Sequence, residues 1–91
     1  MRTIWKYALG APVFEVTVPK GGIVRLVETD PATGYPAVWI EHDGGDAEVR
    51  TFVTVGTGGG VEEGLEHRGS VIAGSFVWHV YERTLAQDPR P

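Results

Sequence analysis

The sequence contains no cysteine, so neither a disulfide nor a thiolate metal ligand can stabilise the chain. A chain of 91 residues is one domain, and a domain of this size buries only roughly 60% of the surface that its unfolded chain exposes. Such a chain must pack very well alone or bury further surface by association. We therefore expect a homodimer or a higher homo-oligomer.

The sequence also lacks a long apolar run and an excess of basic residues. No segment approaches the roughly 20 apolar residues of a membrane span, and Lys6 interrupts the apolar N-terminus before it could form a signal peptide. Eight basic residues against twelve acidic ones give a net charge of −4, which argues against long nucleic acid as a partner. The expectation is a cytoplasmic protein of a bacterium or of a phage-infected bacterial host.

What the sequence does contain is β-branched residues, divided into short segments by its 13 glycines. Apolar and polar residues alternate within these segments, and no long segment has a helical period, as in a small antiparallel sandwich or barrel of about seven strands. We expect one all-β domain over residues 1–83 and a polar, mobile tail over residues 84–91. The predicted strands are Thr3 to Leu9, Val13 to Val18, Ile23 to Thr29, Tyr35 to His42, Glu48 to Val55, Glu66 to Ile72 and Ser75 to Arg83.

Several of these strands have apolar residues on both faces. In the last strand Phe76, Trp78 and Val80 alternate with Val77 and Tyr81, so each face is apolar or aromatic. A two-layer domain of this size cannot bury both faces of several strands within one chain. This pattern again favours a subunit interface, although a closed barrel with a covered outer face would also fit.

The predicted strand Glu48 to Val55 runs into the glycine-rich segment 56–60. A phosphate-binding P-loop needs a lysine and a following helix, whereas Glu62 and Glu63 follow here, so that interpretation fails. Successive backbone N–H groups could still bind an anion without a helix. The alternatives are a flexible connection between two strands and a loop that contacts a ligand.

Metal-binding and catalytic patterns are not recognisable. The three histidines, His42, His67 and His79, are not spaced as metal ligands. Ser70 and Ser75 have no base at a recognisable spacing. We therefore predict no metal, no cofactor and no enzymatic activity. His79, between Trp78 and Val80, is either a core or interface residue or a ligand contact.

Aromatic side chains are the better indication of a binding function. Three tryptophans and three tyrosines are many for this length, and aromatic faces stack on nucleobases. Lys6 lies beside Trp5, and Arg50 is two residues from Phe52, so a cation accompanies a ring in both places. The alternative is that these rings only form the core and the interface.

Four motifs resemble a family of short phage-encoded proteins of unknown function. They are Ile4-Trp5-Lys6-Tyr7, Arg50-Thr51-Phe52, Gly56-Thr57-Gly58 and a closing strand from Val77 to Glu82. The resemblance covers nearly the whole chain. This sequence departs from the family pattern after Gly58, where members often have histidine and proline and this chain has two further glycines. Contacts made by that loop are therefore expected to differ.

Small phage proteins of this type are similar to sponges that bind the cyclic oligonucleotide signals of bacterial CBASS immunity and sequester them without hydrolysis. The resemblance implies an oligomeric anti-CBASS protein that binds a cyclic dinucleotide or a related signal. The residues then implied are Trp5 or Trp39 for base stacking, Arg50 for a phosphate, Thr51 and Thr57 for phosphate or ribose, Gly56 and Gly58 for backbone N–H groups, and Lys6 and His79 as further contacts. The alternatives are a module that engages a host protein through an apolar sheet face and, third, a hydrolase of such nucleotides.

Overall fold

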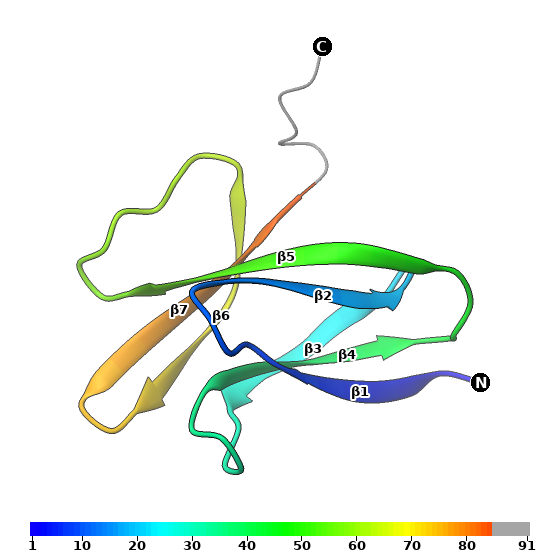
Figure 1. Ribbon diagram of the computed structural model, residues 1–91, viewed down its shortest axis with the longest axis horizontal. Coiled ribbons are helices and arrows are strands. Elements are labelled where there is room, and N and C mark those ends of the chain that lie inside the picture. The colour runs from blue at the N-terminus through cyan, green and yellow to red at the C-terminus, as the bar shows by residue number, and fades with distance from the viewer. Residues whose placement is uncertain (85–91) are drawn as a thin grey trace.

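The computed structural model describes residues 1–84, which form two antiparallel β-sheets packed face to face. The seven strands are β1 (Thr3–Ala8), β2 (Val13–Pro19), β3 (Ile23–Thr29), β4 (Pro36–His42), β5 (Ala47–Gly56), β6 (Leu65–Ala73) and β7 (Phe76–Arg83). The expected all-β fold is confirmed, and of the two architectures left open it is the sandwich (Figure 1). Within residues 1–84, no helix is long and apolar enough to cross a membrane.

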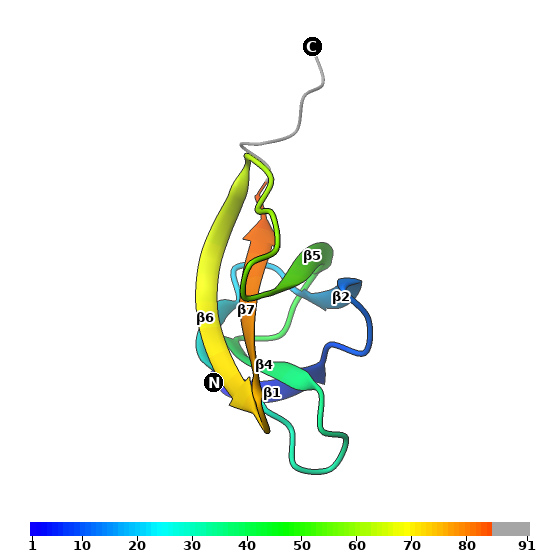
Figure 2. The ribbon, with the colours of Figure 1, turned by 90° about the vertical axis from the view of Figure 1, so that its left-hand side faces the viewer.

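The two sheets differ in size and in strand order. The smaller sheet has the order β1-β4-β3, and the larger has the order β2-β5-β7-β6. Figure 2 shows the larger sheet across its strands, with β6 and β2 at its two edges. Every pairing is antiparallel, and β7 lies between β5 and β6, so its side chains meet neighbours on both sides.

The core lies between the sheets and is built by alternation along each strand. In β2, Val16 and Val18 point inward and are buried, whereas Glu15 points to solvent, in keeping with the alternation of apolar and polar residues in this segment. Phe52 of β5 and Val80 of β7 are completely buried on the same inner face. The core cluster consists of Leu9, Val16, Val18, Val38, Ile40, Phe52 and Val80.

One side of the sandwich is closed by the edge strands β3 and β6. Gly69 of β6 lies so close to Val27 of β3 that a Cβ on it would be 2.7 Å from the Val27 Cβ. The Thr29 hydroxyl donates a hydrogen bond of 3.4 Å to the Ile72 carbonyl oxygen across the same gap. Because a glycine is required at this contact, residue 69 sets how closely the two edges approach.

The predicted strand boundaries agree with the structure to within one residue. Pro36 begins β4, the central strand of its sheet, where the first residue does not need to donate to the ladder. Of the predicted tail, residues 85–91 lie outside the described residues.

Candidate binding sites

A hydrophobic pocket opens at the end of the sandwich where three connections meet. These are the β1–β2 turn, the β3–β4 loop and the β6–β7 hairpin, of which the last two project from the same end of the molecule (Figures 1 and 2). The cavity has a volume of about 400 Å³. Its lining residues are Leu9, Gly10, Ala11, Pro12, Gly34, Tyr35, Pro36, Thr54, Ala73, Phe76 and Trp78. We call this cavity the end pocket.

Three aromatic rings line the end pocket. Phe76 and Trp78 follow each other on the inner face of β7, and their rings stack with centroids 5.8 Å apart and planes 21° apart. Tyr35 and Phe76 remain more than half exposed, at 53% and 62%, so their rings are available to a ligand. Gly56 is packed against Trp78, because a Cβ there would be 3.2 Å from the Trp78 ring. Gly56 thus makes room for the tryptophan.

A buried polar atom lies in the wall of this otherwise apolar pocket. The side-chain oxygen of Thr54 is buried and has no hydrogen-bond partner. An unpaired buried hydroxyl costs free energy, on the order of 1–3 kcal/mol.

Lys6 shapes the loop that carries Tyr35. Its ammonium group lies 3.2 Å from the carboxylate of Asp30, which is 2% exposed at the start of the β3–β4 loop. Asp30 also accepts a hydrogen bond from the Ala32 backbone N–H at 3.0 Å. That N–H, followed by Lys6, holds the pKa of Asp30 below its usual value. Lys6 therefore acts on the end pocket by fixing the loop, and the pocket lining itself has no charged side chain.

A second polar cluster lies on the inner face of the larger sheet, and Arg50 is its centre. Arg50 Nε and Nη2 donate to the two carboxylate oxygens of Glu82 at 2.6 and 2.8 Å, and its Nη1 donates to the Gly22 carbonyl oxygen at 2.6 Å. Arg68 Nε donates to the same carboxylate at 2.9 Å. We call Arg50, Arg68 and Glu82 the ion cluster.

The ion cluster is largely removed from solvent. The side chains of Arg50 and Glu82 are 12% and 6% exposed. Burial by itself raises the pKa of Glu82, but the hydrogen bonds from Arg50 and then Arg68 outweigh it, so that the pKa of this carboxyl lies below its usual value. Arg50, bound on three of its nitrogens, primarily joins β5 to β7 and to the segment before β3.

A third group of polar side chains lies on the outer face of the larger sheet. Ser70 Oγ is 2.7 Å from His79 Nδ1 and 3.0 Å from His67 Nε2. His79 Nε2 is 2.9 Å from the Thr57 hydroxyl. We call Thr57, His79, Ser70 and His67 the hydroxyl–imidazole chain. Ser70 and His79 are directly opposite each other in the β6–β7 register, which explains their contact.

A family model matches residues 1–91 of the sequence. The chain belongs to the DUF7352 family, a domain of unknown function. Comparisons with curated proteins and with solved structures gave no match. The function of this DUF7352 chain must therefore be argued from the geometry of its sites.

The structure of the DUF7352 chain brings only some of the sequence-predicted site residues together. Thr57 and His79 are in direct contact, while Arg50 lies on the other face of the sheet. Thr51 points to the outer face, because it is opposite the exposed Glu15 of β2 in the register. Gly58 has a positive φ of 92° in the exposed β5–β6 loop, a conformation that favours glycine.

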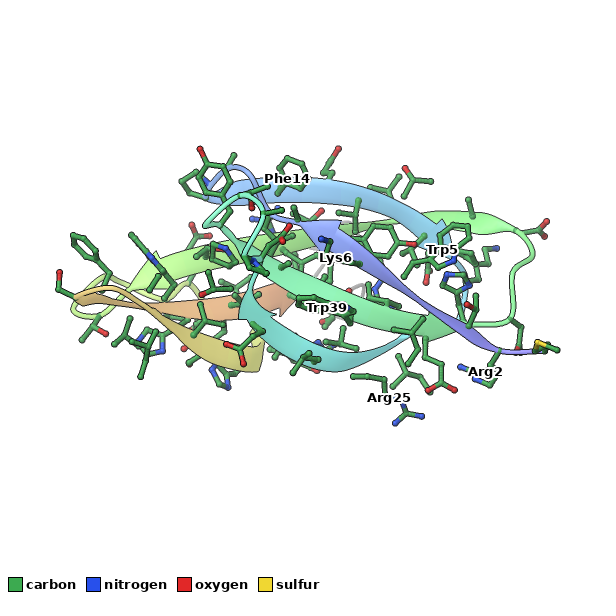
Figure 3. The ribbon with its side chains drawn as sticks, turned by 90° about the horizontal axis from the view of Figure 1, so that it is seen from below. Arg2, Trp5, Lys6, Phe14, Arg25 and Trp39 are labelled. Atoms are coloured by element: carbon green, nitrogen blue, oxygen red, sulfur yellow. The ribbon has the colours of Figure 1, made fainter. Side chains whose placement is uncertain are left out.

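The two tryptophans proposed for base stacking lie on opposite faces of the smaller sheet (Figure 3). Trp5 is opposite the buried Ile40 and makes an edge-to-face contact with His42 at 4.8 Å. Trp39 is opposite Lys6 on the outer face. Neither lines the end pocket, so the structure places them in separate environments.

The end pocket and the hydroxyl–imidazole chain include residues that the sequence did not assign to a site. The sequence shows Tyr35, Phe76 and Trp78 only as aromatic residues. They line one pocket together with Thr54 because the arrangement of the strands brings their segments to the same end of the sandwich. Ser70 has its base nine residues away on a paired strand. A hairpin register centred on the turn residues Gly74 and Ser75 is the signal that could have placed Ser70 opposite His79. The described residues contain no group of three or more metal-ligating side chains.

Proposed function

We propose that this DUF7352 protein binds a cyclic oligonucleotide second messenger, such as a cyclic dinucleotide, and sequesters it without hydrolysing it. The observation that carries the proposal is the end pocket, an open cavity of about 400 Å³ with three aromatic rings in its lining. Ligand sites commonly have volumes of roughly 300–1,000 Å³ and are lined by apolar and aromatic side chains with a few polar groups. The pocket has these properties and the size for one nucleobase.

In this proposal the base is held by stacking. The base stacks on the Phe76 and Trp78 rings, with Tyr35 on the loop opposite. Stacking on an aromatic side chain contributes about 1–3 kcal/mol per base. Since no lining side chain is charged, the phosphates remain at the mouth of the pocket. The lining residues provide no general acid or base near neutral pH, which accords with binding rather than hydrolysis.

A homo-oligomer would suit a ligand with two bases. A cyclic dinucleotide has two-fold symmetry and presents one base to each of two symmetry-related subunits. The resemblance to phage proteins adds a biological role, in which the protein removes a CBASS alarm signal in the cytoplasm of an infected bacterium. Sequestration needs tight binding and abundance, and it needs no turnover.

The test is a calorimetric titration of the purified protein with a panel of cyclic dinucleotides. Phe76→Ala should weaken binding of the recognised nucleotide about tenfold or more, because one stacking contact is lost. Ile72→Ala is the matched control, since Ile72 is an exposed residue of the same hairpin outside the pocket. The bound nucleotide should be recovered intact after heat denaturation. No binding across the panel, or equal loss in both variants, would contradict the proposal.

A second candidate function is engagement of a host protein through the outer face of the larger sheet. Val13, Val49 and Ile72 are 55%, 61% and 74% exposed on this face. Val13 lies opposite Val53, and Val53 lies opposite Tyr81, so an apolar row crosses β2, β5 and β7 on this face, and contiguous apolar side chains of this kind occur at protein interfaces. Val49→Glu should abolish association measured by mass photometry, with host protein or between copies, while nucleotide binding in the end pocket is kept. Loss of nucleotide binding in Val49→Glu would favour a ligand site on this face instead.

A further inference from the structure

Two tautomers of a neutral His79 ring are compatible with the distances in the hydroxyl–imidazole chain. In the tautomer with the proton on Nε2, His79 donates to the Thr57 hydroxyl, and Thr57 can donate to the Val77 carbonyl oxygen 3.5 Å away. His79 Nδ1 is then unprotonated and accepts the hydroxyl hydrogen of Ser70. The inference below takes this tautomer.

The same tautomer determines the other hydrogen bond of Ser70. Since its single hydrogen is directed to His79, Ser70 Oγ accepts a hydrogen bond from His67 Nε2–H at 3.0 Å. The His67 ring makes an edge-to-face contact with Tyr81 at 5.2 Å, which restrains its orientation. All four side chains thus donate in one direction, from His67 through Ser70 and His79 to Thr57.

This is the arrangement that makes a serine hydroxyl nucleophilic. A base within hydrogen-bond distance removes the hydroxyl proton, and a third group fixes the tautomer of that base. Here His79 Nδ1 is the base at 2.7 Å, and the Thr57 hydroxyl accepts the hydrogen bond of the other ring nitrogen in this tautomer. The hydrogen bond that His67 donates to Ser70 Oγ orients the serine hydroxyl toward His79.

We propose that Ser70 is a reactive nucleophile that accepts an acyl group from a small activated ester. Ser70 lies on an exposed face, so an ester can approach its oxygen. The neighbouring side chains on this face are apolar, with Val55 opposite His79 and Val77 opposite Ile72 in the register. An acyl group with a short aliphatic chain fits this surface. The inference goes beyond nucleotide binding and does not depend on what the end pocket binds.

The step is an ordinary acyl transfer. Ser70 Oγ forms a bond to the carbonyl carbon of the ester while its proton moves to His79 Nδ1. The bond between that carbon and the alcohol oxygen then breaks, and the departing alcohol takes the proton from His79. Water, deprotonated by the same imidazole, releases the acid and regenerates the serine.

The experiment uses two probes, a fluorophosphonate that labels activated serines and p-nitrophenyl acetate. Peptide mass spectrometry of the full chain should place the label on Ser70, and Ser70→Ala should abolish it. His79→Gln should lower the labelling rate about 10²-fold, the usual contribution of a general base. Ser75→Ala is the matched control, because Ser75 is exposed in the turn of the same hairpin, and this variant should be labelled at the rate of the unchanged protein.

Thr57 is a positioning residue in this proposal, and its test needs a conservative variant. Thr57→Val should slow labelling of Ser70, whereas Thr57→Ser should restore it, because only the hydroxyl matters. Failure to label Ser70 in the folded protein would overturn the proposal. So would labelling that Ser70→Ala and Ser75→Ala lower equally, or a rate that His79→Gln leaves unchanged.

Discussion

Strand β7 places two polar clusters on opposite faces of one sheet, and they differ in what surrounds them. Glu82 points inward to Arg50 and Arg68, where three charged groups are largely removed from water. His79, three residues earlier, points outward to Ser70 and Thr57, which are exposed and uncharged. Buried charges must be paired to be tolerated, whereas exposed neutral groups contribute little to stability. The inner cluster is therefore expected to hold the fold, and the outer one is free to serve chemistry.

Removing the inner carboxylate should have the largest effect. Glu82→Gln leaves Arg50 and Arg68 without their shared anion and should lower the free energy of unfolding by roughly 3 kcal/mol. Glu41→Gln is the matched control, because Glu41 also binds two arginines, Arg2 and Arg25, each at 2.7 Å, but on the solvent side (Figure 3). Urea denaturation should show a much smaller loss for that variant. Equal losses would mean that burial does not distinguish the two networks.

A smaller loss in the free energy of unfolding is expected from a substitution of Gly69. This residue of β6 lies between Arg68 of the inner cluster and Ser70 of the outer one. Gly69→Ala would place a Cβ 2.7 Å from the Val27 Cβ and force β6 away from β3. Such overpacking costs about 1–3 kcal/mol. Gly60→Ala should leave the unfolding free energy unchanged, because no atom lies within 4 Å of its Cβ position. Thermal unfolding of the two variants measures the difference, and a neutral Gly69→Ala would show that the two edges adjust without cost.

Acid should weaken the inner cluster in a predictable range. The pKa of Glu82 is lower in the folded protein than its ordinary value of 4.5, so its stabilising contribution is fully present above that value and is lost as the pH falls through the folded pKa. Urea unfolding of the unchanged protein and of Glu82→Gln at a series of pH values separates the contribution of Glu82 to the free energy of unfolding from the contributions of Asp30 and Glu41. The difference between the two proteins should shrink below pH 4.5. A constant difference would contradict an ionised Glu82.

The outer cluster should give the smallest change in stability. Ser70→Ala removes an exposed hydroxyl and should alter the unfolding free energy by no more than about 0.5 kcal/mol. Chemical denaturation of this variant beside Glu82→Gln completes the comparison between the faces of β7. A loss as large as that of Glu82→Gln would assign the hydroxyl–imidazole chain a structural role.

Local patterns predicted the elements of this fold well. Alternation in Val13 to Val18 identified which residues of β2 face the core, and the turn signals placed every strand within one residue of its position. These features depend only on residues that are close in sequence, so each segment can be interpreted without knowing which other strands it pairs with. The sequence also showed that several strands have apolar residues on both faces. The expectation that these residues form the interface of a homo-oligomer stays a prediction.

The sites were less predictable because they join distant segments. Arg50 suggested a phosphate contact, but its carboxylate partner is 32 residues away on a strand whose pairing the sequence did not reveal. Trp5 and Trp39 were grouped as aromatic residues, although the register of β1 and β4 places them on opposite faces. Strand order and register are determined by the packing of the whole chain. Residue types alone could therefore suggest stacking but could not locate the pocket.

The exposed loop from residue 57 to residue 63 makes this domain a convenient scaffold for engineering. Only its first residue, Thr57, belongs to the hydroxyl–imidazole chain, and Gly58 to Gly60 separate that residue from the rest of the loop. Lengthening a flexible surface loop costs only about 0.6 kcal/mol for each doubling. A peptide tag or a fluorophore attachment sequence inserted after Gly60 should thus be displayed without disturbing the strands.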